Sequence, residues 1–149
     1  MNSDLRKFVE AIQISQLDER VQYCLSMDCI PEEIVQYMKD GRNKDKPIII
    51  GIFGRGIGHA VLAYDIEESS DFTYIHVYDS NYPLEDRTIR FTKTAGLNFD
   101  WDYDLTNTIS IDSTVNKNAW ISYVPYEVYS AVWKDHGIYD PDKWADDLV

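Results

Sequence analysis

The sequence predicts a single α+β domain, in which helices at the start of the chain pack on a mostly antiparallel sheet. The chain has 149 residues, of which 44% are hydrophobic, enough to bury one core. Its first part shows apolar residues at helical spacing, and its middle part shows short apolar or alternating runs separated by turn residues. We expect a helical part over residues 1–45, a sheet over 46–125, and a C-terminal helix and tail over 126–149.

Two helices are predicted before the sheet. Apolar residues at steps of three and four indicate an amphipathic helix over residues 4–25, with Asp4 as its N-cap and a break near Ser15. Pro31 is typical of a first helical position, and Glu32 and Glu33 follow it in the first turn. The second helix is therefore expected to run from Pro31 to Asp40.

The sheet is predicted to begin with a buried strand and a hairpin. Residues 48–53 form a continuous apolar run, which is typical of a strand buried on both faces. Glycines at 54, 56 and 58 then return the chain into a strand over 59–66. This glycine-rich loop lacks the lysine of a P-loop and leads into a strand, so it predicts a turn and not a phosphate site. Residues 67–71 form the next turn, and 72–79 return.

Three further strands and a last helix complete the prediction. Residues 87–92 alternate like an edge strand, and residues 97–104 alternate aromatic or apolar side chains with polar ones. Residues 119–124 form another strand. A short helix is then expected from Pro125 to Gly137.

The strongest chemical feature is a histidine at the start of one predicted strand and a carboxylate at the end of the next. A turn centred on Ser69 would place His59 directly opposite Asp79, with Cβ atoms about 4.5–5.5 Å apart. Four apolar side chains would share their face: Val61, Ala63, Ile75 and Val77. A carboxylate bonded to one ring nitrogen leaves the other free to act as a base toward a thiol or hydroxyl. The same pair could instead be purely structural.

Charge and composition exclude several functions. The net charge of -12 disfavours nucleic-acid binding. No apolar run approaches the roughly 18 residues of a membrane span, and no signal peptide is visible, so we expect a cytoplasmic chain or part of a longer secreted one. The aspartates at 100, 102 and 104 resemble a calcium loop, but Leu105 replaces its glycine and Ile111 its closing glutamate. We expect no metal and no cofactor.

The sequence Gly58-His59-Ala60-Val61-Leu62-Ala63-Tyr64, followed by Ile75-His76-Val77-Tyr78-Asp79-Ser80-Asn81-Tyr82-Pro83, resembles the second half of papain-fold cysteine peptidases. The most similar group is the double-glycine, bacteriocin-processing type and its bacterial relatives. The resemblance covers residues 45–92. It implies a papain-like fold, hydrolysis of a peptide bond, His59 as the base and Asp79 as its orienting partner. A peptide or protein ligand would then bind a groove that includes Gly58, Tyr78, Asn81 and Tyr82.

The chain departs from that family at the nucleophile. Family members carry the reactive cysteine far upstream, at the start of a helix after a glutamine-bearing loop. Here the cysteines are Cys24 and Cys29, too few for a disulfide scaffold, and buried roles are expected for both. The chain could be a piece of a longer protein that holds the cysteine helix, which we prefer. It could also be a non-catalytic peptide-binding or regulatory domain, or Cys24 could reach the pair by an unexpected path.

Overall fold

The computed structural model describes residues 18–44, 46–93, 100–106 and 108–135. Within these ranges, two α-helices and a 3₁₀ turn are followed by seven strands and then a further helix. In chain order they are α2 (Glu19–Ser26), α3 (Pro31–Lys39), η1 (Gly41–Asn43), β1 (Ile48–Gly54), β2 (Ile57–Glu68), β3 (Phe72–Tyr78), β4 (Arg87–Thr92), β5 (Asp100–Asp104), β6 (Ser110–Asp112), β7 (Trp120–Val124) and α4 (Tyr126–Asp135). The predicted α+β class is confirmed.

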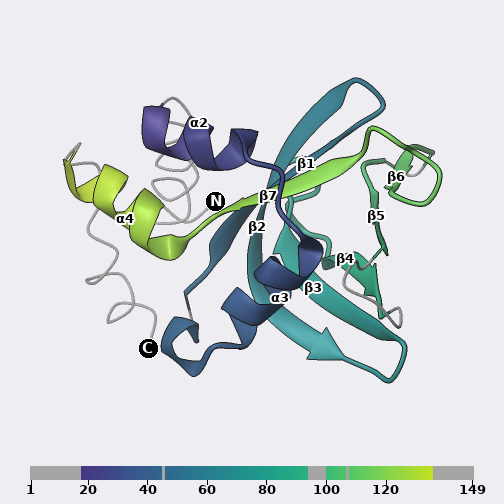
Figure 1. Cartoon of the computed structure of the whole chain (residues 1–149), viewed down its shortest axis with the longest axis horizontal. Helices are drawn as coiled ribbons and strands as arrows, with labels where there is room; N and C mark the ends of the chain where they lie inside the picture. The colour runs from purple at the N-terminus through teal and green to yellow at the C-terminus, as the bar shows by residue number, and fades with distance from the viewer. Residues whose placement is uncertain (1–17, 45, 94–99, 107, 136–149) are drawn as a thin grey trace.

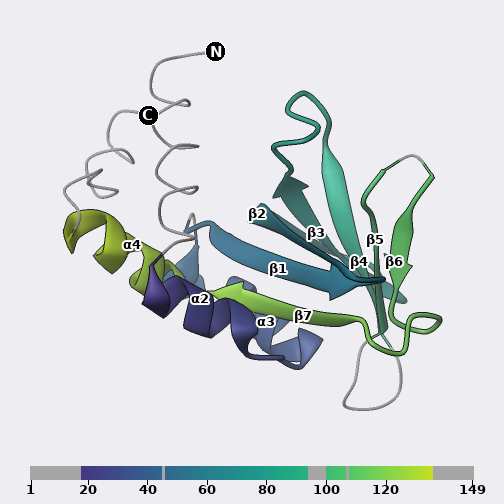
Figure 2. The same cartoon turned by 90° about the horizontal axis from the view of Figure 1, so that it is seen from above.

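The strands form one antiparallel sheet in the order β6-β5-β4-β3-β2-β1-β7. The sheet curls, so that β4, β5 and β6 turn away from the plane of β1 and β7 (Figures 1 and 2). Curling gives the sheet an inner face and an outer face, and each face has its own core.

The inner face is the larger core. Ile48, Ile50 and Ile52 of β1 point into it, and helix α3 adds Ile34 and Val35. The outer face is covered by α2 and α4, whose buried residues pack against the remaining side of β1, β2 and β7: Val21, Ile49, Leu62, Val124, Tyr129, Val132 and Trp133. β1 is therefore buried on both faces, as its continuous apolar run predicted.

The helix starts follow local capping chemistry. The side chain of Asp18 accepts a hydrogen bond from the backbone N–H of Arg20 at 2.9 Å, which caps α2. The expected cap Asp4 and the first part of the predicted helix lie outside the described residues. Helix α3 begins at Pro31, as predicted, because proline has no N–H to leave unpaired in the first turn.

The β1–β2 hairpin confirms the predicted turn. Gly54 pairs with Ile57, so Arg55 and Gly56 form a two-residue connection, with φ values of 55° and 73°. Positive φ at both positions is the signature of a type I′ turn, whose twist matches the strands it joins.

The β2–β3 ladder differs from the predicted register. A bulge lies between Ala63 and Asp65, and the ladder ends at the pair Leu62–Tyr78. The position of Asp79 consequently falls opposite Val61, two residues from the predicted partner. The turn joins the pair Glu68–Thr73, which moves the register three residues from the prediction, and the bulge brings it back by one. Neither feature had a signal in the alternation pattern.

Two strand predictions were incomplete. β4 lies between β3 and β5, so the prediction that residues 87–92 form an edge strand is wrong. Its alternation arises because Ile89 and Phe91 are buried while Arg90 faces solvent, a pattern that central antiparallel strands share with edges. The edge strand β6 was not predicted, since three residues are too few to show a period.

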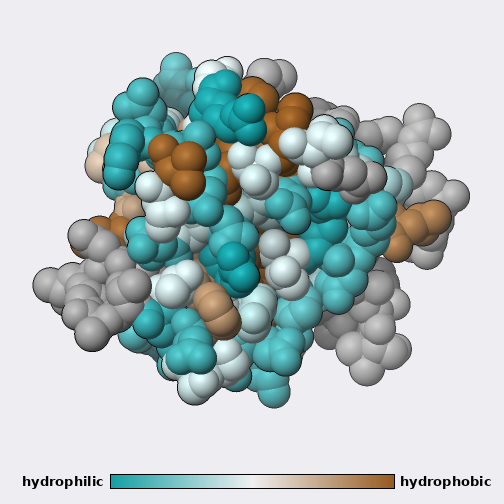
Figure 3. Space-filling view, turned by 90° about the vertical axis from the view of Figure 1, so that its right-hand side faces the viewer, coloured by the Kyte–Doolittle hydropathy of each residue, from teal (hydrophilic) through white to brown (hydrophobic). Residues whose placement is uncertain are grey.

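The side of the molecule that carries β5 and β6 is mostly hydrophilic, with apolar groups separated from one another (Figure 3). On this part of the sheet the Arg90 guanidinium lies 2.9 Å from the Asp102 carboxylate, so the aspartates of β5 serve in part as ion-pair partners. Within the described ranges, no helix has the length and apolar character needed to cross a bilayer.

Candidate functional site

The structure brings His59 and Asp79 together. The Nε2 atom of His59 lies 2.9 Å from Oδ2 of Asp79. Both side chains are on the inner face, above the apolar residues that the sequence placed beneath them: Val61, Ala63, Ile75 and Val77. Asp79 is completely buried, whereas the imidazole of His59 keeps 15% of its surface exposed. Because residues two apart share a face of a strand, the pair forms diagonally despite the shifted register.

Asp79 is held by further donors. The hydroxyl of Tyr103 donates to Oδ2 at 2.6 Å, and the backbone N–H of Asn81 donates to Oδ1 at 2.9 Å. Burial by itself would raise the pKa of Asp79, but the hydrogen bonds from Tyr103, Asn81 and His59 outweigh it and lower the pKa. Asp79 is therefore a carboxylate at neutral pH, and it accepts a hydrogen bond from Nε2–H of His59.

This arrangement leaves Nδ1 of His59 as an acceptor. Among the residues that the structure describes, no hydrogen-bond partner of Nδ1 is found. A neutral imidazole with its proton on Nε2 carries a lone pair on Nδ1, so the ring can take a proton there. The pair thus has the geometry of an oriented general base.

Arg87 completes a polar network around the pair. Its guanidinium carbon lies 4.0 Å from the ring centroid of Tyr82 and 5.6 Å from that of Tyr103. It also donates to the carbonyl of Asp104 and, at 2.9 Å, to the carboxylate of Glu85. The sequence reasoning missed both Tyr103 and Arg87. Alternation placed Tyr103 on an apolar face, but no local signal links it to Asp79.

The structure does not bring Cys24 to His59. Cys24 lies on α2 and packs against the core of the outer face, while the imidazole lies on the inner face. Burial raises the pKa of the Cys24 thiol. Cys29 packs against the inner core instead, and burial together with the carboxylates of Glu33 and Asp28 raises its pKa to about 12. Neither thiol is in an environment that favours the reactive thiolate.

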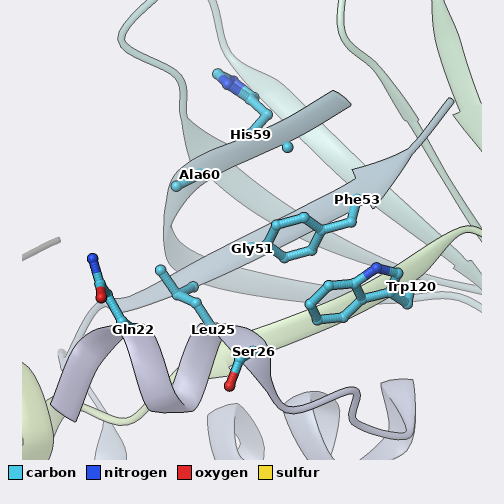
Figure 4. A pocket seen from close by; sticks show the side chains of 9 residues that line it. Gln22, Leu25, Ser26, Gly51, Phe53, His59, Ala60 and Trp120 are labelled. Atoms are coloured by element: carbon cyan, nitrogen blue, oxygen red, sulfur yellow. The ribbon is translucent and has the colours of Figure 1, made fainter. Parts of the chain in front are cut away.

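An open, largely apolar groove of about 540 Å³ lies on the outer face, between α2 and strands β1, β2 and β7. The rings of Phe53 and Trp120 stack at a centroid separation of 3.9 Å along one side. Leu25 and Gln22 of α2 form the opposite side. Figure 4 shows the imidazole of His59 pointing away from the side chains of α2, so His59 borders the groove without directing its ring at them.

The predicted groove residues separate in the structure. Gly58 lines the outer-face groove. Tyr78 packs against the outer core near it. Asn81 is exposed and gives its backbone N–H to Asp79, while Tyr82 covers the guanidinium of Arg87. Asn81 and Tyr82 therefore belong to the surroundings of the His59–Asp79 pair.

Within the described residues, no group of histidine, cysteine and carboxylate side chains is arranged to hold a metal ion. Comparison of the chain with family models, with curated proteins and with solved structures finds no match.

Proposed function

We propose that this chain is a cysteine-peptidase-like domain that carries the base and the orienting carboxylate of a catalytic apparatus, but no nucleophile of its own. The observation that supports the proposal most strongly is the completely buried Asp79, which accepts a hydrogen bond from Nε2 of His59 and leaves Nδ1 open. A buried carboxylate is costly unless it is fully paired, and here the pairing orients a histidine. The resemblance of residues 45–92 to papain-fold peptidases agrees with these roles.

A thiol placed near Nδ1 would complete the reaction. His59 would take the thiol proton as the sulfur attacks the peptide carbonyl, and would then give that proton to the leaving amine. Asp79 would hold the ring in place and stabilise the imidazolium formed between these steps. Since Cys24 packs on the other face and the pKa of Cys29 is raised, the thiol would come from another segment or another chain.

Thiol reactivity tests the proposal. Cys24 and Cys29 are both half-buried. Iodoacetamide should alkylate them slowly at neutral pH, at rates typical of thiols that no base activates, and the rates should be the same in His59→Ala. Extended peptides should not be cleaved by the isolated chain. Rapid alkylation near pH 7 that is lost in His59→Ala would show that the chain activates its own thiol, contrary to the proposal.

The groove on the outer face favours a second function, the binding of a peptide without catalysis. Its stacked aromatic wall, formed by Phe53 and Trp120, lies on the opposite face of β2 from the imidazole, so it could bind an extended peptide without catalysis. In that case peptide titration should shift the amide resonances of Gly51 and Gly58 in the chain, and Phe53→Ala should weaken binding. Binding that perturbs only residues around His59 would contradict this second function.

A further inference from the structure

We propose that Tyr103 is a positioning residue for His59: its hydroxyl holds Oδ2 of Asp79 as an ionised acceptor, so that the imidazole keeps its proton on Nε2 and presents Nδ1. Only the role of Nδ1 as a base rests on the proposed function. The ionisation and the tautomer themselves are measured without a substrate.

Two donors converge on one oxygen atom. Oδ2 of Asp79 lies 2.6 Å from the hydroxyl of Tyr103 and 2.9 Å from Nε2 of His59. The shorter distance is typical of an O–H group bonded to a charged carboxylate. A carboxylate oxygen can accept both bonds, but an oxygen that carried its own proton would not accept both in this way. The Asn81 N–H occupies the other oxygen, Oδ1.

Tyr103 is suited to remain a donor. Burial and the hydrogen bond to Asp79 raise the pKa of its hydroxyl, so the proton stays on the oxygen at neutral pH. Tyr103 is 1% exposed, and its position on β5 between β4 and β6 fixes the hydroxyl against the sheet. Its ring also lies beside that of His59, with a centroid separation of 6.4 Å and an angle of 21° between the planes.

The charge of Arg87 also favours a hydrogen bond from the Tyr103 hydroxyl to Asp79. The guanidinium carbon of Arg87 lies 5.6 Å from the centroid of the Tyr103 ring, and its N–H groups can only donate hydrogen bonds. It therefore cannot take the hydroxyl proton away from Asp79. The side chains of this network come from β2, β4 and β5 and from the segment directly after β3. These four strands are neighbours in the sheet, so the strand pairing sets the spacing of the side chains.

Tyr103→Phe removes the hydroxyl and keeps the ring. Tyr129→Phe is the matched control, because Tyr129 is equally buried but lies in the outer core, where its hydroxyl donates to the carbonyl of Pro47. The titration of the Asp79 carboxyl carbon and the proton resonance of His59 Nε2–H are followed by NMR. We expect the Asp79 titration to move to higher pH, and the Nε2–H resonance to shift or broaden, in Tyr103→Phe alone.

Unchanged Asp79 titration and an unchanged Nε2–H resonance in a folded Tyr103→Phe protein would overturn the inference. If that variant does not fold, 3-fluorotyrosine can be incorporated instead, which keeps the hydroxyl and makes it a stronger hydrogen-bond donor. The Asp79 titration should then move to lower pH. No movement would again overturn the inference. Failure of a thiol-bearing partner to restore peptide hydrolysis would count against the proposed function and would leave these NMR results standing.

Discussion

At the scale of single residues, the site depends on one buried charge. Asp79 is 0% exposed and accepts hydrogen bonds from Tyr103, His59 and the backbone of Asn81. Each bond to a charged group contributes about 1.5–3 kcal/mol, whereas an unpaired buried carboxylate would be strongly destabilising. The same bonds that make Asp79 tolerable in the core also orient the imidazole.

We predict that Asp79→Asn lowers the free energy of unfolding by about 2–3 kcal/mol at pH 7, because the amide replaces one acceptor with a donor facing other donors. The pKa of Asp79 is lower in the folded chain than in the unfolded chain. Its stabilising contribution is therefore present above the unfolded pKa and is lost as the pH falls through the folded pKa. Urea unfolding over a range of pH should show the difference between wild type and variant shrinking in acid.

Asp104→Asn is the control for that series, since Asp104 is an exposed carboxylate on β5. It should change stability by no more than about 0.5 kcal/mol at any pH. A difference between wild type and Asp79→Asn that stays constant down to the acid transition would mean that the charge of Asp79 is not what stabilises the fold.

The sequence indicated the pair but not its surroundings. Alternation along two strands was enough to put His59 and Asp79 on one face, and a register shift of two residues preserves that face. The bulge near Tyr64 could not be read, because one extra residue leaves no mark on the pattern. Tyr103 was also beyond reach, since its contact with Asp79 depends on how β5 is carried across the sheet.

At the scale of elements, the outer face depends on a close approach between β1 and α2. Gly51 lies on β1 where a Cβ atom would come within 2.7 Å of Ser122 Oγ and 2.9 Å of Leu25 Cδ2. The absence of a side chain therefore allows α2 to pack against the strand beside the groove. Helix α3 and strands β1 and β7 were predicted from signals in their own sequences. The packing of α2 against Gly51 was not, because it depends on contacts between distant parts of the chain.

We predict that Gly51→Ala lowers the free energy of unfolding by about 1–3 kcal/mol, because Leu25 and Ser122 must shift to admit the methyl group. Gly41→Ala is the matched control, as nothing lies within 4 Å of a Cβ built at Gly41. Chemical unfolding of both variants checks the prediction. Equal stabilities for the two variants would indicate that α2 does not pack closely over Gly51.

In the whole molecule, an acidic chain packs one hydrophobic core on each face of its sheet. The net charge of -12 makes like charges repel over the surface, and the view beyond β5 and β6 is mostly hydrophilic (Figure 3). The fold class followed from the order of helical and alternating patterns. The curl did not follow from it, and neither did the packing of α2 on the outer face, which puts Cys24 on the opposite face from the His59 imidazole.

We predict that the melting temperature rises when sodium chloride is raised from about 10 mM to about 150 mM, because the Debye length shortens from about 30 Å to about 8 Å and screens this repulsion. Differential scanning calorimetry provides the measurement, and the same change of osmolality made with an uncharged solute is the control. A melting temperature that falls with salt would show that attractive ion pairs outweigh the net repulsion.

The tautomer of His59 in the wild-type chain, read from the ¹⁵N resonances of its neutral imidazole, shows directly whether Asp79 orients the ring. We expect a proton on Nε2, shared with Asp79, and an unprotonated Nδ1. A neutral ring that carries its proton on Nδ1 would contradict this expectation, because His59 would then have no lone pair to offer as a base on the open side of the ring.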